Sequence, residues 1–385
     1  MSTVQHGNSP PAVALFGAFC LFLSTVEYLI PKPIPFMRLG LANVPLMLAT
    51  TIFPFKTFLI LVLMKIFGQA LVSGTLFSYI FLFSMAGTTV SALAMYSIHR
   101  VVPSRYISFI GIGIIGACFS NGVQLILARF IIFGESARYI TPPFLIMGSI
   151  TGLSLGIFCE HFKNKSQWYQ AQLTKKSFSG EYCSITPSPK ILTKSICSSR
   201  DICIAGLIAL PAFLFNQHDI SRVIQCILFM LYVLLTGKKI NIVMTVIVIG
   251  TIIGFNLLVP FGKVLIAFGT LKITEGALWA GIRRAVTLEG LIMLSKASIR
   301  HDLQFPGTFG MLISESFRLF ALIPEQKNTL NPKYIIRDLD SLLLTLSASP
   351  VDTVKQQQRS TPLGIMFLAV AVSLVWLMFF VPFFA

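Results

Sequence analysis

The sequence predicts an all-α, polytopic integral membrane protein, and three observations favour this class. The chain is 55% hydrophobic and only 11% charged, with a mean hydropathy of +0.81, whereas soluble domains carry about 25% charged residues. Long apolar runs such as residues 107–118 and 240–259 lack the polar face of a soluble helix. These runs approach the length of a membrane span, and lipid forces them to be helical because their backbone must be satisfied internally.

The first apolar block, residues 1–160, is predicted to cross the membrane six times. We interpret the first apolar segment as a retained span because residues 1–10 carry no Lys or Arg and no small-residue cleavage site follows. The two longer connectors, residues 31–40 and 129–142, fall on one side. The predicted spans are residues 11–30, 41–53, 57–72, 76–98, 106–127 and 143–160.

A basic stretch, residues 161–200, separates this block from a second one. Its only acidic residue is Glu181. The positive-inside rule therefore places the stretch in the cytoplasm, and we expect a bacterial cytoplasmic membrane. The same rule explains the net charge of +16, and no nucleic-acid partner is expected because basic and aromatic residues are not interleaved. The basic residues of the stretch are Lys163, Lys165, Lys175, Lys176, Lys190, Lys194 and Arg200.

The second block, residues 201–385, is predicted to have about five spans and a cytoplasmic helical insert. One crossing lies within residues 264–294, where Thr274 is the expected N-cap and Arg283–Arg284 interrupts the apolar run. The other spans are residues 202–215, 223–235, 240–259 and 363–385.

The insert, residues 295–361, is too charged to be membrane. It contains a short helix at 310–323 and a second helix that begins at Asn331–Pro332. An amphipathic helix of this kind lies in the membrane interface or presents its apolar stripe to a protein. The stripe of the second helix comprises Ile335, Ile336, Leu339, Leu342, Leu343 and Leu346.

Ionisable and amide side chains gather toward one membrane face of the first block. A charge at membrane depth costs about 3 kcal/mol, so it normally faces a partner or a cavity. One interpretation is that Lys65 and Arg129 snorkel to the surface and Glu27 pairs with one of them. The other is an outward-facing cavity for a small solute. The candidate solute-binding residues are Glu27, Arg38, Asn43, Lys65, Gln69, Asn121, Gln124, Arg129, Glu135 and Arg138.

Small residues recur at a spacing of four in two predicted spans. Gly148, Gly152 and Gly156 form a ridge without side chains, and Ala14 and Ala18 form a weaker version. Such ridges let another helix approach closely. The partner is another helix of this chain or a separate membrane module.

The first block resembles the substrate-binding S component of energy-coupling factor transporters. It is especially similar to the Gx transporter family, which is also labelled heptaprenyl diphosphate synthase component I. The resemblance implies six helices, an outward pocket closed by the first loop, and a small micronutrient-like solute. The matching runs are residues 23–28 (LSTVEY), 34–45 (IPFMRLGLANVP), 65–79 (KIFGQALVSGTLFSY) and 121–139 (NGVQLILARFIIFGESARY).

The second block is similar to the transmembrane coupling component of the same transporters through residues 269–295 (GTLKITEGALWAGIRRAVTLEGLIMLS). This resemblance implies separate ABC-type ATPase subunits as partners, held by coupling helices at about residues 300–360. Coupling components normally use an Ala-Arg-Gly tripeptide, which residues 295–361 lack. The nearest candidate coupling residues are Arg318 and Arg337.

We expect this chain not to be an enzyme and to need no cofactor or metal. It has no phosphate-binding Gly-x4-Gly-Lys-Ser/Thr loop, and its seven cysteines have no metal-ligand spacing. Asp338 and Asp340 lack the second aspartate cluster that would hold magnesium and diphosphate, so we interpret them as a solvated helix face. Two alternatives remain: a membrane protein of isoprenoid or quinone lipid synthesis, and a solute-binding membrane protein without energy coupling.

Overall fold

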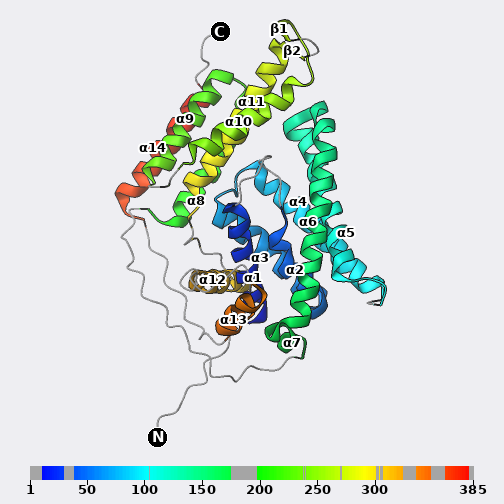
Figure 1. Cartoon of the computed structure of the whole chain (residues 1–385). Helices are drawn as coiled ribbons and strands as arrows, with labels where there is room; N and C mark the ends of the chain where they lie inside the picture. Colours follow the sequence, from blue (N-terminus) through cyan, green and yellow to red (C-terminus); the bar gives the residue numbers. More distant parts are fainter. Residues whose placement is uncertain are drawn as a thin grey trace.

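The computed structural model is helical nearly throughout the residues it describes, which confirms the all-α class. Figure 1 shows the first block on the right and lower side and the long helices of the second block at the upper left. The only strands among the described residues form one hairpin. The described residues are 11–29, 39–103, 105–174, 197–236, 238, 240–268, 271–300, 303, 307–323, 335–347 and 360–380.

Six helices of the first block lie at the six predicted spans. A 3-10 helix, η1 (Leu41–Asn43), precedes α2, and Pro54 precedes α3 directly. Gly74 ends α3 with a φ of +64°, a left-handed conformation that favours glycine after a helix. The helices are α1 (Ala12–Leu29), α2 (Val44–Ile52), α3 (Phe55–Ser73), α4 (Tyr79–Val101), α5 (Phe109–Ala128) and α6 (Ala137–Lys165).

The predicted connector at residues 129–142 is wrong, because this segment is helical throughout. A π-helix, η2 (Arg129–Phe133), and a 3-10 helix, η3 (Gly134–Ser136), lead directly into α6. Pro142 and Pro143 lie inside α6. Each proline removes one backbone hydrogen bond. The carbonyls that lose a partner belong to exposed residues near the start of α6, which limits the cost.

The basic stretch at 161–200 also begins as helix. After α6 ends at Lys165, α7 (Gln167–Thr174) follows almost at once, and α8 begins at Ser199. Residues 175–196 lie outside the described part. The start of the predicted linker is therefore mostly helical, and its role as a linker stays a prediction.

The second block contains five long helices and the hairpin. Within residues 264–294, where one crossing is expected, β1 (Val264–Phe268) and β2 (Leu271–Thr274) form an antiparallel hairpin, and the helix begins at Glu275. Thr274 does occupy the N-cap position of the next helix, but its hydroxyl accepts a hydrogen bond from Phe261 N at 3.0 Å. The helices are α8 (Ser199–Leu214), α9 (Asp219–Leu235), α10 (Ile242–Leu257), α11 (Glu275–Ser298) and α14 (Pro362–Phe380).

Several described helices are long and apolar enough to cross a membrane: α3, α4, the continuous stretch Phe109–Lys165, and α14. The apolar helices at the start of the chain and α10 are shorter. Helices α8 and α9 have 16 and 17 residues, and α11 has 24 residues but carries two arginines near its middle. A crossing by these three helices stays a prediction.

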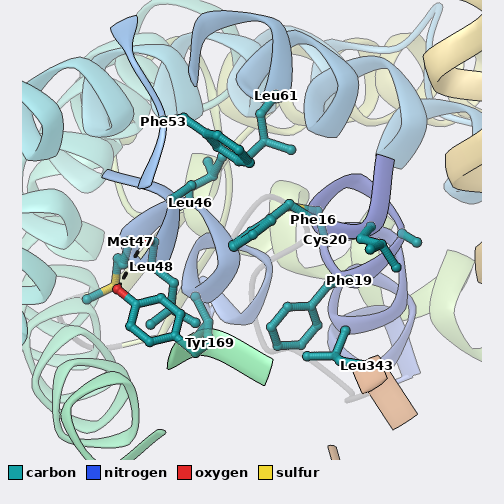
Figure 2. Packing of buried hydrophobic residues seen from close by; sticks show 14 of the residues in the cluster. Phe16, Phe19, Cys20, Leu46, Met47, Leu48, Phe53, Leu61, Tyr169 and Leu343 are labelled. Carbon is teal, nitrogen blue, oxygen red and sulfur yellow. Dashed lines mark hydrogen bonds between the residues drawn. The ribbon is translucent and has the colours of Figure 1, made fainter. Parts of the chain in front are cut away.

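The two helices of the insert, α12 (Gly307–Leu322) and α13 (Ile335–Ser347), form as predicted, while Asn331–Pro332 lie outside the described residues. Figure 1 shows both helices beside α1 and not beside α11 or α14. Most of the predicted α13 stripe is buried, although Ile335 is 51% exposed. Figure 2 shows Leu343 of α13 near Phe19 of α1, in one hydrophobic core. The stripe therefore contacts the first block.

Candidate functional site

A polar cavity lies among the helices of the first block. It is lined from η1 and from α1 to α6. About 580 Å³ of its space is not filled by atoms, part of it open to the surroundings, and its cavity volume is about 40 Å³. Six of the ten predicted solute-binding residues line it: Glu27, Asn43, Lys65, Gln69, Asn121 and Gln124.

Two buried charges, Lys65 and Glu27, contribute to the cavity wall. Lys65 is 3% exposed, and its ammonium group donates hydrogen bonds to Asn43 Oδ1 and, at 3.1 Å, to Thr88 Oγ1. Glu27 is 2% exposed and accepts a hydrogen bond from Leu39 N at 2.9 Å. Lys65 therefore points inward instead of snorkelling. Glu27 holds the described end of the first connector against the cavity.

Amide and hydroxyl groups supply acceptors that the protein leaves unused. Gln124 Nε2 donates to Ser120 Oγ at 2.8 Å. Gln124 Oε1, Gln69 Oε1 and Ser91 Oγ are buried and find no hydrogen-bond partner among the described residues. Buried acceptors in folded proteins are nearly always bonded. A bound molecule that donates hydrogen bonds would satisfy these acceptors.

The glycine ridge of α6 packs against α5 within this chain. A Cβ on Gly148 would lie 1.5 Å from Asn121 Nδ2, and a Cβ on Gly152 would lie 2.8 Å from Gly113 O. A Cβ on Gly156 would meet the backbone of α5 at 2.5 Å. The ridge thus brings the two helices into contact and places Asn121 in the cavity wall.

The other predicted solute-binding residues do not line the cavity. Arg129 and Glu135 form an ion pair at 2.7 Å with each other, and both are exposed. The Arg138 guanidinium lies 4.8 Å from the centre of the Tyr139 ring, and Arg38 lies outside the described residues. A role for these four in the solute path stays a prediction.

Several hydroxyl groups of the cavity wall were not predicted from the sequence, among them Thr88, Ser91, Ser120 and Thr151. Serine and threonine are frequent at helix contacts in membranes. No signal in the sequence separates those that line a cavity from those that only pack. Their spacing on α4 and α5 becomes informative only once the two helices are placed.

The candidate coupling residues differ in their surroundings. Arg318 donates to both carboxylate oxygens of Glu315 within α12, at 2.9 and 2.6 Å, and both side chains are largely buried. Arg337 on α13 is exposed. Of the two, only Arg337 is presented on the surface of the insert.

Asp340 corrects the expectation of a solvated aspartate face on α13. Its side chain is 8% exposed and accepts hydrogen bonds from Ser166 Oγ, Gln167 N at 3.1 Å and Trp168 N at 3.0 Å. These donors lie at the start of α7, whose first backbone N–H groups have no partner inside the helix. Asp340 therefore caps α7, the helix directly after the first block, from a helix of the second block.

The two blocks also touch elsewhere. Ser316 Oγ of α12 donates to Ala14 O of α1 at 3.0 Å, and a Cβ on Gly17 would lie 2.4 Å from the same hydroxyl. Near the middle of α11, Arg284 donates to the backbone carbonyl of Ile132 in η2 at 3.3 Å. The small-residue face of α1 thus receives α12, and the π-helix receives α11.

The block that holds the cavity matches a known protein family. Residues 16–162 match the family described as heptaprenyl diphosphate synthase component I. Residues 200–301 match a domain of unknown function, DUF8519. No curated protein and no solved structure matches the chain. The family resemblance of the first block is confirmed, and its name is compatible with a membrane component.

Proposed function

We propose that this chain is the membrane subunit of an energy-coupling-factor-type uptake transporter. Its first block binds a small micronutrient-like solute, and its second block couples that block to separate ATPase subunits. One observation carries the proposal: α12 and α13, which belong to the second block, pack on α1 of the first block and on α7 directly after it. Because α1 also brings Glu27 to the cavity, movement of the insert reaches the site through one helix.

The residues of the cavity favour a solute that has hydrogen-bond donors together with an anionic or carbonyl group. Lys65 provides the positive charge, while Gln69 and Gln124 provide buried acceptor oxygens. Charge-assisted hydrogen bonds are roughly twice as strong as neutral ones, so Lys65 supplies most of the affinity. The amides then fix the orientation of the solute.

We place the contact with the ATPase subunits on the exposed face of α13. Its apolar face is buried on the first block, which leaves Arg337 on the opposite side. A guanidinium there can bind acidic side chains of a soluble partner through paired hydrogen bonds. We assign this contact to Arg337, because Arg318 is occupied by Glu315.

The test separates solute binding from coupling. The full chain is purified from its host cell together with the proteins that bind it. Native mass spectrometry then reports whether solute and ATPase subunits are bound. Lys65→Met should lose the solute and keep the ATPases, whereas Arg337→Glu should do the reverse. Arg105→Glu is the matched control, since Arg105 is an exposed arginine in the α4–α5 connector. A chain that never retains an ATPase would refute the coupling role.

A second candidate is a membrane component of isoprenoid or quinone lipid synthesis, which the description of the matched family favours. In that case the purified chain would bind a prenyl synthase or convert prenyl diphosphates with magnesium. Asp340, one of the two neighbouring aspartates of α13, is engaged in capping α7. We therefore favour transport and assign no catalytic residue.

A further inference from the structure

The second block contains a groove of its own between α9 and α11. It holds about 1040 Å³ of space not filled by atoms, part of it open to the surroundings. Its walls include the apolar side chains of Val223, Ile224, Ile282 and Val286. Among the described residues, it shares no lining residue with the polar cavity of the first block.

The rim of the groove carries one excess positive charge. Arg283 donates to both oxygens of Asp219, through Nε at 2.8 Å and Nη2 at 2.7 Å, and is thereby neutralised. Arg222 bonds only neutral groups there, the carbonyl oxygen of Asn216 and, at 3.3 Å, the hydroxyl of Thr287. Arg222 also lies within electrostatic range of Asp219 and Arg283. Two guanidinium groups thus face one carboxylate.

The charges lie where α9 begins, beside exposed aromatic and aliphatic side chains. Trp279 is 54% exposed and Ile220 is 66% exposed, and both line the groove. Tryptophan and arginine are typical of the level at which a helix leaves the bilayer. Val223 and Val286 continue the groove along the two helices, away from this level.

We propose that this groove binds an anionic glycerophospholipid of the membrane leaflet that holds the start of α9. The exposed guanidinium of Arg283 bonds the phosphate through Nη1, which neither bond to Asp219 uses. Arg222 supplies the excess positive charge beside Arg283. One acyl chain lies along the apolar walls. Free phosphate would leave these walls without a partner, and a zwitterionic lipid would leave the excess charge without one.

Native mass spectrometry of the detergent-purified full chain tests the site. The chain is titrated with phosphatidylglycerol, with phosphatidylcholine and with inorganic phosphate. One phosphatidylglycerol should bind in preference to phosphatidylcholine, and phosphate should not displace it. Arg222→Gln removes the excess charge and Val286→Trp fills the groove, so each should weaken phosphatidylglycerol binding at least about tenfold.

Asp219→Asn distinguishes the site from a folding defect, because it should tighten phosphatidylglycerol binding by removing the opposing charge. Arg105→Gln and Val370→Trp, at exposed positions elsewhere, should leave binding unchanged. Equal binding of the two lipids, or displacement by phosphate, would overturn the proposal. So would unchanged phosphatidylglycerol binding in both Arg222→Gln and Val286→Trp. The proposal does not depend on the transport function.

Discussion

Replacing Asp340 should loosen the contact between the insert and the first block. The carboxylate of Asp340 accepts hydrogen bonds from Ser166 Oγ, Gln167 N and Trp168 N. Ser166 Oγ in turn accepts from Tyr169 N at 3.0 Å, as an N-cap residue does. Of the first three backbone N–H groups of α7, those of Gln167 and Trp168 are thus satisfied by Asp340, and that of Tyr169 is satisfied by Ser166.

The magnitude follows from these contacts. Loss of a helix cap costs about 1 kcal/mol. A buried donor left unsatisfied adds about 1–3 kcal/mol, and Trp168 is fully buried. We therefore expect Asp340→Ala to lower the free energy of unfolding by about 3 kcal/mol. Asp340→Asn keeps one acceptor oxygen and loses the charge, so about 1 kcal/mol is expected.

The assay is reversible unfolding of the detergent-solubilised chain, with Asp338→Asn as a charge-matched change two residues away on the same helix. A double-mutant cycle of Asp340→Ala with Ser166→Ala isolates the contact between the two blocks. We expect a coupling energy of about 1 kcal/mol or more. If Asp340→Asn were no more destabilising than Asp338→Asn, the capping argument would be wrong.

Three further predictions concern close contacts and one buried hydroxyl. Gly152→Ala should lower the free energy of unfolding by about 2 kcal/mol, because its Cβ would lie 2.8 Å from a backbone oxygen of α5. Gly122→Ala is the control: it has open space around it and should be neutral or slightly stabilising. Gly17→Leu should push α12 away from α1, which faster hydrogen exchange of the α12 amides would report. Burial raises the pKa of Tyr169 to about 12, so its stabilising contribution is complete below its unfolded pKa of about 10 and is lost between there and pH 12. Tyr169→Phe should remove that part of the pH dependence, measured as unfolding free energy at pH 9 and 11.5.

The spans were predictable because lipid leaves an apolar chain few choices. With no water to bond the backbone, runs such as α3 and α14 must be helical, and turn residues such as Gly74 mark their ends. The segment 129–142 was predicted to be a loop because its charges and prolines are typical of one, but it is helical. Its charged side chains are exposed at the start of α6, where solvent or headgroups satisfy them without a break in the helix.

Part of the site was predictable for the same physical reason. Lys65 lies near the middle of α3, too far from either end to reach the surface, so it had to face a polar interior. Glu27 lies near the end of α1, and it is buried where the first connector donates a hydrogen bond to it from Leu39 N. Arg129 and Glu135 differ because they lie at a helix end and satisfy each other at the surface. The depth of a charge along its helix therefore explains Lys65, whereas the place of Glu27 depends on a tertiary contact.

The partner of an amphipathic helix could not be predicted from its stripe. The pattern of α13 fits a membrane surface as well as a protein surface, and nothing local distinguishes Asp338 from Asp340. The distinction arises from α7, which lies more than 160 residues earlier and presents unpaired N–H groups to one of the two aspartates. Such a contact depends on tertiary structure alone.

One helix links the cavity to the insert. Ala14 of α1 accepts a hydrogen bond from Ser316 of α12, and Glu27 of the same helix lines the cavity. The two residues are separated by about 20 Å at 1.5 Å per residue. A helix of that length moves as a rigid unit when both ends are packed. Under the proposed function, an ATPase that displaces α12 must therefore alter the cavity wall at Glu27. By thermodynamic reciprocity, a solute that bonds this wall must change the affinity of α12 for α1.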